Sequence, residues 1–197
     1  MPTLPNKPTF TRTLPPEGTH VARVIGFVYM GTITEDGKFG VTTNQKVRLT
    51  WELPDELHVF KEGEGAKPLV HSEEYNLVMG TTAKPSKIRP IIEGILGTSL
   101  SDEEAYKFDA ESLVNMPCLI SLKKAKSQKG ADYMKLASTS KLMKGQTCKE
   151  AFNELRVFNY AEKYDEKYLE SLPSFIKDKM KSSDEYKALH GITDEEV

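Results

Sequence analysis

Three β-type segments follow one another before the first helical pattern of this sequence. Residues 20–34 form a β-branched and aromatic run without helix caps, and residues 46–53 alternate strictly between apolar and polar side chains. A third β-type segment lies near residues 70–79. A parallel βαβ sheet needs a helix between successive strands, so this order disfavours that architecture.

The spacing of apolar residues becomes helical after the third segment. Four isoleucines recur at helical intervals within residues 85–97, which end in a glycine of the kind that terminates helices. Ser101 and Glu104 have the spacing of a capping box, which predicts a second, short helix. Two more β-type segments, residues 118–125 and 131–142, follow these helices.

The resulting order of elements predicts a mainly β fold with added helices. Three strands, a helical insertion and two further strands are the order of the OB-fold, a five-stranded Greek-key barrel with its helix between strands 3 and 4. Gly26 and Gly31 interrupt the first strand, where bulges would let a sheet bend into a barrel. A β-sandwich would need about seven strands, which is more than the five that the sequence predicts. We therefore expect an OB-fold domain over residues 17–145, with its second strand ending at Pro54.

The two ends of the chain differ from this central part. Residues 1–16 contain five prolines and little apolar pattern, which predicts a flexible N-terminal arm. Residues 146–197 are predicted to form a helical extension, with helices starting near Thr147, Pro173 and Ser183 and the first running through residue 155. The extension ends in an acidic tail formed by Asp194, Glu195, Glu196 and Val197.

Charge is distributed unevenly along the chain. The formal net charge is −2, but residues 116–150 hold eight lysines and two acidic residues, a net charge of +6. Residues 151–197 have a net charge of −4. A basic patch followed by an acidic segment is compatible with nucleic-acid binding, and equally with a solvated lysine-rich hairpin.

The OB-fold would place this basic patch at its nucleic-acid face, which is formed by strands 2 and 3 and by the loops L12 and L45. The loop L12 is expected at residues 34–45, and the loop L45 at residues 126–132. The predicted interface comprises Lys38, Phe39, Lys46, Arg48, Lys123, Lys124, Lys126, Lys129, Tyr133 and Lys135.

Single-strand binders combine cationic grooves with aromatic stacking platforms. Tyr133 is the best candidate platform, because it is in phase with Lys135 and out of phase with the apolar residues of its segment. Trp51 shares its phase with apolar residues, so we expect it in the core. Phe39 either stacks on a base or caps the barrel end. Lys46 and Arg48 either hold phosphates or serve solubility.

No catalytic or metal-binding motif is present. The four histidines are scattered, and the chain lacks a Walker loop, a nucleophile elbow and a dinucleotide-binding glycine motif. Of the two cysteines, Cys118 lies in an apolar stretch and is expected in the core. Without a signal peptide or a membrane-spanning run, we expect a cytoplasmic protein that is not an enzyme and needs no cofactor.

Several segments resemble phage-encoded OB-fold single-stranded DNA-binding proteins. The similarity covers roughly residues 16–145 and is most specific at Trp51-Glu52-Leu53-Pro54 and at Glu74-Tyr75. It implies sequence-nonspecific binding of single-stranded DNA in phage replication or recombination, in the bacterial host cytoplasm. The acidic end resembles tails that recruit replication or recombination proteins, although it ends in Val197 rather than in an aromatic residue.

Two other functions remain open from the sequence. The chain could be an adaptor whose OB-like barrel binds another protein of a replication or recombination complex. It could also be a mediator that anneals complementary strands. Exposed apolar residues on the barrel face, away from the lysines, would favour the adaptor.

Overall fold

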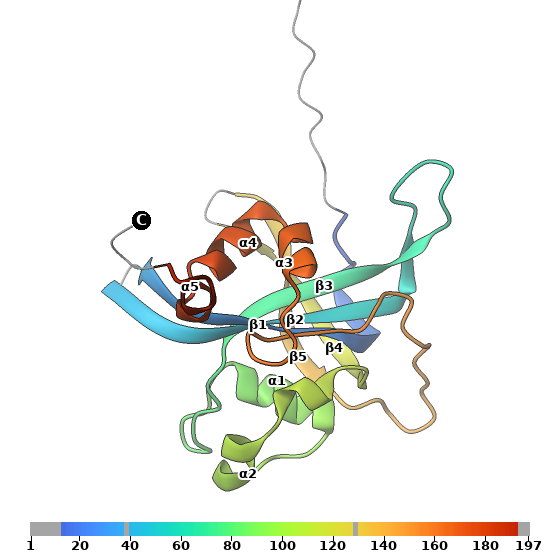
Figure 1. Ribbon diagram of the computed structural model, residues 1–197. Helices are drawn as coiled ribbons and strands as arrows, with labels where there is room; N and C mark the ends of the chain where they lie inside the picture. Colours follow the sequence, from blue (N-terminus) through green and yellow to red (C-terminus); the bar gives the residue numbers. More distant parts are fainter. Residues whose placement is uncertain (1–12, 38–39, 128–129, 193–197) are drawn as a thin grey trace, which may run out of the picture.

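The computed structural model describes residues 13–37, 40–127 and 130–192 (Figure 1). Over these residues the fold is mainly β, with one six-stranded sheet and five α-helices. The strands are β1 (Gly18–Gly37), β2 (Gly40–His58), β3 (Lys67–Asn76), β4 (Pro117–Lys126), β5 (Asp132–Ser140) and β6 (Arg156–Phe158). The helices are α1 (Ile88–Leu96), α2 (Asp102–Lys107), α3 (Glu166–Ser171), α4 (Ser174–Lys181) and α5 (Asp184–His190), with a 3-10 turn at Ala110–Leu113.

The sheet has the strand order β3-β2-β1-β4-β5, and every neighbouring pair on this path is antiparallel. The helical insertion lies between β3 and β4, as predicted. In the part of the chain that the structure describes, no backbone ladder joins β3 to β5, so the sheet is not a closed barrel. The structure thus confirms the mainly β class with its helical insertion, and leaves an open seam between the two strands at the ends of the path.

The first core fills the interior of this curved sheet. Val47, Leu49, Trp51 and Leu53 are fully buried, as the alternation of β2 predicts. Trp51 is therefore a core residue, and Cys118 lies in the same core. The register of β1 against β2 shifts between Val24 and Gly26 and again between Tyr29 and Gly31, which confirms the two predicted bulges.

The helical insertion closes one side of the first core. The isoleucines of α1 pack into the core, and Gly97 ends the helix with a left-handed conformation. Gly94 lets α1 approach β5 closely, because a Cβ there would lie 2.4 Å from the carbonyl oxygen of Thr139. The predicted capping box of Ser101 and Glu104 is present at the start of α2.

Two predicted strand ends are wrong. Residues 34–37 and 40–45 do not form a loop: β1 continues to Gly37, β2 starts at Gly40, and Thr34 pairs with Thr43 through a 2.8 Å hydroxyl hydrogen bond. Polar β-branched residues sustain this exposed ribbon, although their polarity is also typical of a loop. Pro54 does not end β2, because the register shift between Leu53 and Leu57 places it where no ladder hydrogen bond is needed.

The helix predicted from Thr147 is also wrong. The backbone of this segment is held by two buried charged side chains of the sheet instead of by its own hydrogen bonds. Arg23 donates to the carbonyl oxygens of Cys148 and Lys149 at 3.2 and 3.0 Å. Glu52 accepts from the backbone nitrogen atoms of Phe152 and Asn153, both at 2.8 Å.

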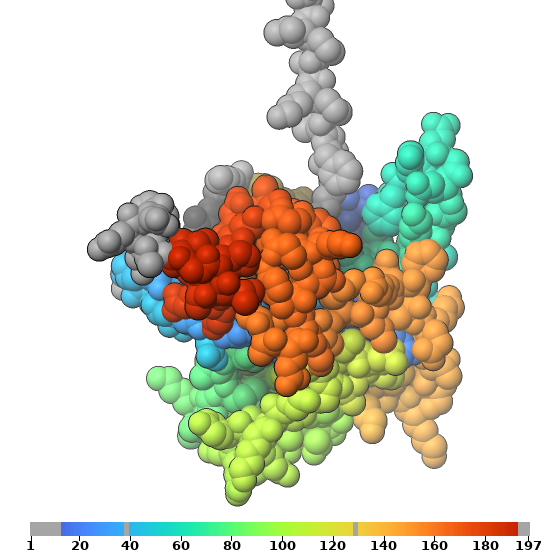
Figure 2. All heavy atoms as spheres, viewed as in Figure 1, coloured from blue at the N-terminus to red at the C-terminus, as the bar shows by residue number. Residues whose placement is uncertain are grey.

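The chain then returns to β1, the central strand of the sheet. Strand β6, which the sequence did not reveal, pairs in parallel with Gly26–Val28 of β1. A second core follows, in which Phe158, Leu169, Ile176 and Met180 pack against Val28, Met30 and Ile33 of β1. Figure 2 shows the orange and red atoms of this C-terminal segment lying against the blue atoms of the β1–β2 ribbon. The segment is thus packed onto the sheet.

Helices α4 and α5 begin close to where the sequence predicts them, after Pro173 and Ser183. Most of the predicted N-terminal arm, residues 1–12, lies outside the described residues, whereas Leu14 packs against the first core. None of the helices in the described ranges is long and apolar enough to span a bilayer.

Candidate nucleic-acid interface

The outer face of the β4–β5 hairpin brings together three residues of the predicted interface. Lys123 lies opposite Lys135 in the ladder, and Ala125 lies opposite Tyr133. Met134 and Leu136 alternate with them and point into the core. Directly paired residues of neighbouring strands lie on the same face, so Tyr133 lies beside the pair formed by the two lysines. Tyr133 is 41% exposed, so part of this residue is accessible to a base.

The other predicted residues of this hairpin are arranged differently. Lys124 lies on the opposite face from Lys123 and forms a 2.7 Å ion pair with Asp132, which raises the pKa of the lysine. Lys126 lies opposite Asp132 in the ladder, on the same face as Lys124. Lys129 is outside the described residues. The predicted lysine group is therefore divided between two faces.

Three hairpin lysines have no anionic partner among the residues that the structure describes. Within residues 13–37, 40–127 and 130–192, Lys123, Lys126 and Lys135 are exposed and form no ion pair. Two further exposed lysines without an ion pair, Lys141 and Lys144, follow β5 along the chain. Lysines without carboxylate partners are free to neutralise phosphates.

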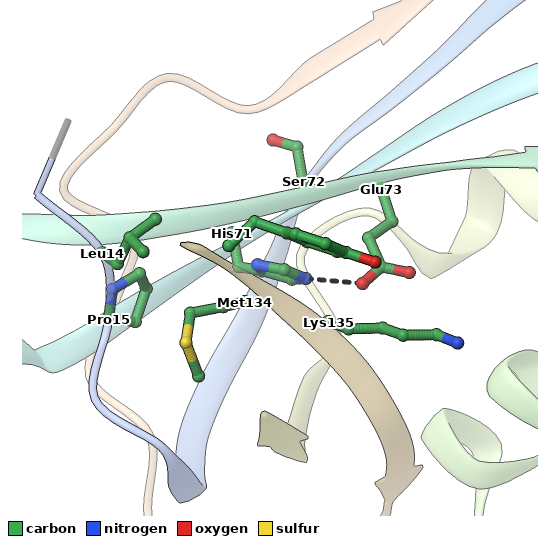
Figure 3. A pocket seen from close by; sticks show the side chains of 8 residues that line it. Leu14, Pro15, His71, Ser72, Glu73, Met134 and Lys135 are labelled. Carbon is green, nitrogen blue, oxygen red and sulfur yellow. Dashed lines mark hydrogen bonds and ion pairs between the residues drawn. The ribbon is translucent and has the colours of Figure 1, made fainter. Parts of the chain in front are cut away.

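A pocket of about 300 Å³ lies beside Tyr133, at the seam between β3 and β5 (Figure 3). We call it the seam pocket. Figure 3 shows Leu14 and Pro15 at one end of it, and Glu73 and Lys135 at the other. Its lining residues are Leu14, Pro15, His71, Ser72, Glu73, Tyr133, Met134 and Lys135.

Glu73 connects the two strands of the seam. Its carboxylate accepts hydrogen bonds from His71 Nε2 at 3.1 Å, from the Tyr75 hydroxyl at 3.0 Å and, across the gap, from the backbone N–H of Leu136. Burial raises the pKa of Glu73, but these hydrogen bonds outweigh it and hold the pKa below its usual value. Glu73 is therefore a fixed anion at neutral pH.

Lys46 and Arg48 lie on the outer face of β2, and both are engaged in ion pairs. Lys46 pairs with Glu35, and Arg48 lies 3.4 Å from Glu74. Lys179 of α4 binds the same two carboxylates at 2.7 and 2.8 Å. The side chains of Lys46 and Arg48 are only 12% and 17% exposed. The structure therefore separates these two residues from the free lysines of the hairpin.

The remaining predicted positions lie outside the described residues: Lys38, Phe39, Asp194, Glu195, Glu196 and Val197. The sequence reasoning overlooked His71, Ser72 and Glu73. A signal for Glu73 was present, because it shares the strand phase of Tyr75, Leu77 and Met79, which pack against the first core. An acidic residue in a core phase indicates a buried carboxylate with dedicated partners.

A second, larger cavity lies away from the hairpin lysines. It is a groove of about 910 Å³ between the β1–β2 ribbon, residues 77–81 and α2. Apolar side chains dominate its lining, among them Phe27, Leu77, Val78, Met79, Tyr106 and Phe108. We call it the apolar groove. None of the hairpin lysines lines it.

In the described residues, no group of three or more histidine, cysteine, aspartate or glutamate side chains is arranged to hold a metal ion. Comparison with models of protein families gives no match for this chain, and comparison with curated protein sequences gives none either.

Proposed function

We propose that this protein binds single-stranded DNA without strict sequence specificity, through the outer face of the β4–β5 hairpin and the seam pocket. The observation that carries the proposal is the partly exposed Tyr133 beside the directly paired Lys123 and Lys135. An aromatic face can stack on any base, and flanking lysines can neutralise the adjoining phosphates. In a duplex the base faces are covered, so this arrangement favours single strands.

An OB-type barrel is the fold we infer for this sheet. The strand order β3-β2-β1-β4-β5 supports this inference, because an OB barrel closes between strands 3 and 5 of that path. In an OB-fold the β4–β5 hairpin corresponds to the L45 side of the nucleic-acid face. The resemblance of residues 16–145 to phage-encoded single-stranded DNA-binding proteins supports the same reading, and with it a non-enzymatic role in phage replication or recombination in the host cytoplasm.

The proposal is tested by titrating the protein into fluorescent oligo(dT) and into a matched duplex at several salt concentrations. Neutralising three phosphates predicts a slope of about −2 in a plot of log affinity against log salt. Single-strand affinity should then fall roughly 20-fold between about 50 and about 200 mM salt. Salt-sensitive binding with preference over the duplex is the expected result. No binding even at low salt would refute the proposal.

A protein adaptor is the second candidate, and the apolar groove favours it. Exposed apolar surface of this extent is typical of protein-interaction sites, and the groove lies apart from the free lysines. Val78 lines the groove and is 54% exposed, so Val78→Arg would place a charged side chain there without displacing a buried residue. Loss of a partner from cell extracts with unchanged oligo(dT) binding would assign the groove to protein docking.

A further inference from the structure

Two side chains that line the seam pocket, Glu73 and His71, offer hydrogen-bond acceptors, and Lys135 at its edge is a donor. The carboxylate of Glu73 accepts three hydrogen bonds, whereas two carboxylate oxygens offer about four lone-pair sites. One acceptor site is left, and the carboxylate has no proton to donate. Because His71 donates from Nε2 to Glu73, its Nδ1 is an acceptor as well when the ring is neutral.

The rest of the pocket has the character of a site for a small flat ring. Leu14, Pro15 and Met134 supply apolar walls, while Tyr133 and Lys135 stand where the pocket meets the lysine-bearing face. Its volume of about 300 Å³ corresponds to roughly ten water molecules, which is enough for one pyrimidine base. A strand tracked by the hairpin lysines would pass its bases directly over the pocket.

Bases differ in what they would offer to Glu73. Cytosine carries an exocyclic amino group, which donates to carboxylates, whereas thymine carries a carbonyl oxygen at the same ring position. A thymine oriented in this way would place its oxygen against the anion. The two bases are similar in size and both expose a π-face, but thymine also carries a proton at N3 and a methyl group at C5. 2-Pyrimidinone lacks only the amino group of cytosine, so it isolates the contribution of that group.

We propose that the seam pocket takes one unpaired base of the bound strand and favours pyrimidines with an exocyclic amino group, that is cytosine over thymine, through Glu73. The inference rests on the proposed single-strand binding and adds a base preference to it. Such a preference is modest beside the sequence-independent affinity from phosphates and stacking.

The first test varies the DNA and leaves the protein intact. Three homo-oligomers of about 12 nucleotides, a length within the usual footprint, carry cytosine, thymine or 2-pyrimidinone, which is cytosine without its amino group. We expect cytosine to bind about tenfold more tightly than thymine, and 2-pyrimidinone to lose that advantage.

The outcomes separate the two proposals. Equal, salt-sensitive binding of cytosine and thymine oligomers would overturn the base preference while leaving single-strand binding intact. Equal binding of cytosine and 2-pyrimidinone would overturn it too, because the amino group would then contribute nothing. Failure of all three oligomers to bind would overturn both proposals.

The second test changes the protein. Glu73→Gln retains an acceptor oxygen for Leu136 and adds an amide donor that suits thymine, so the cytosine-to-thymine affinity ratio should fall toward one. Glu103→Gln removes the same charge on α2, where Glu103 pairs with Lys107, and should leave the ratio unchanged. An unchanged ratio in a folded Glu73→Gln protein would overturn the role of Glu73. If that variant does not fold, the comparison of the three oligomers with the wild-type protein still tests the base preference.

Discussion

Gly31 lies so close to Ser183 that a Cβ on the glycine would come within 2.5 Å of the serine Cβ. The bulge at Gly31 leaves Met30 without a partner in β2 and lies next to the backbone N–H of Thr32. Glu185, in the first turn of α5, accepts from that N–H at 2.6 Å and from the Tyr29 hydroxyl at 2.7 Å. An irregularity in the first strand is therefore the docking point of the last helix.

Gly31→Ala should destabilise the protein. Gly31 has φ +98, a conformation that suits glycine, and an added methyl group would push against α5. We expect a loss of more than about 1 kcal/mol in the free energy of unfolding, measured by urea denaturation. Gly65→Ala is the matched control, because nothing lies within 4 Å of a Cβ there. Equal stability of the two variants would contradict the packing described for α5.

Glu185 should make stability depend on acid pH. Burial raises its pKa, but hydrogen bonds from Thr32 and Tyr29 outweigh this and lower it. A lowered folded-state pKa contributes stability that is present above the unfolded value, near 4.3, and is lost as pH falls through the folded value. Glu185→Gln should therefore be less stable than the wild type at pH 7, with a gap that shrinks toward about pH 3. Glu103→Gln should show little gap at either pH in thermal melts.

Replacing the hairpin lysines should weaken DNA binding without harming the fold. Lys123 and Lys135 are directly opposed like charges, which destabilise an antiparallel pair. Lys123→Gln with Lys135→Gln should raise the melting temperature slightly, and should reduce the salt slope of oligo(dT) binding by about 1.4. Lys107→Gln on α2 is the control and should keep the full slope. A double variant with wild-type affinity and slope would place the DNA elsewhere.

Tyr133→Leu should remove a stacking platform. Loss of one base–aromatic contact costs about 1–3 kcal/mol, or between about fivefold and about 150-fold in affinity, and should change the salt slope little. Tyr133→Phe keeps the ring and should bind as the wild type does. Tyr106→Leu, at a tyrosine 91% exposed on α2, controls for loss of a surface aromatic residue. Equal affinities of the Tyr133→Leu and Tyr106→Leu proteins would exclude Tyr133 from the interface.

Two truncations should separate the acidic tail from the helix before it. Removing residues 193–197 deletes Asp194, Glu195 and Glu196 and leaves α5 intact, so we expect tighter oligo(dT) binding at an unchanged melting temperature. Removing residues 183–197 also deletes α5 and uncovers the second core, which should lower the melting temperature by several degrees. Unchanged oligo(dT) affinity after the shorter truncation would argue against an electrostatic role of the tail in DNA binding.

The sequence predicted what short-range patterns determine. Alternation in β2, the Ser101 capping box and Gly97 at the end of α1 depend on neighbours a few residues apart, and all are confirmed. The helix predicted from Thr147 failed because the partners of that segment, Arg23 and Glu52, are about a hundred residues away. Long-range contacts of this kind override a local helix signal.

The candidate site was predictable to a similar degree. Strand phase placed Tyr133 and Lys135 on one face, as found. Strand phase did not show that Lys46 would pair with Glu35, or Arg48 with Glu74, because these partners lie on other strands. It also did not show that Lys179 of α4 would bind Glu35. The seam pocket needs β3, β5 and residues 14–15 together, which no local pattern specifies.

The parallel pairing of β6 with β1 has a consequence for how this protein is made. Residues 26–28 are synthesised 130 residues before their partners at residues 156–158. Until then, the apolar side chains of β1 that belong to the second core are exposed to solvent. A nascent chain halted before residue 156 should therefore bind chaperones, and synthesis through residue 192, which completes the second core, should end that dependence.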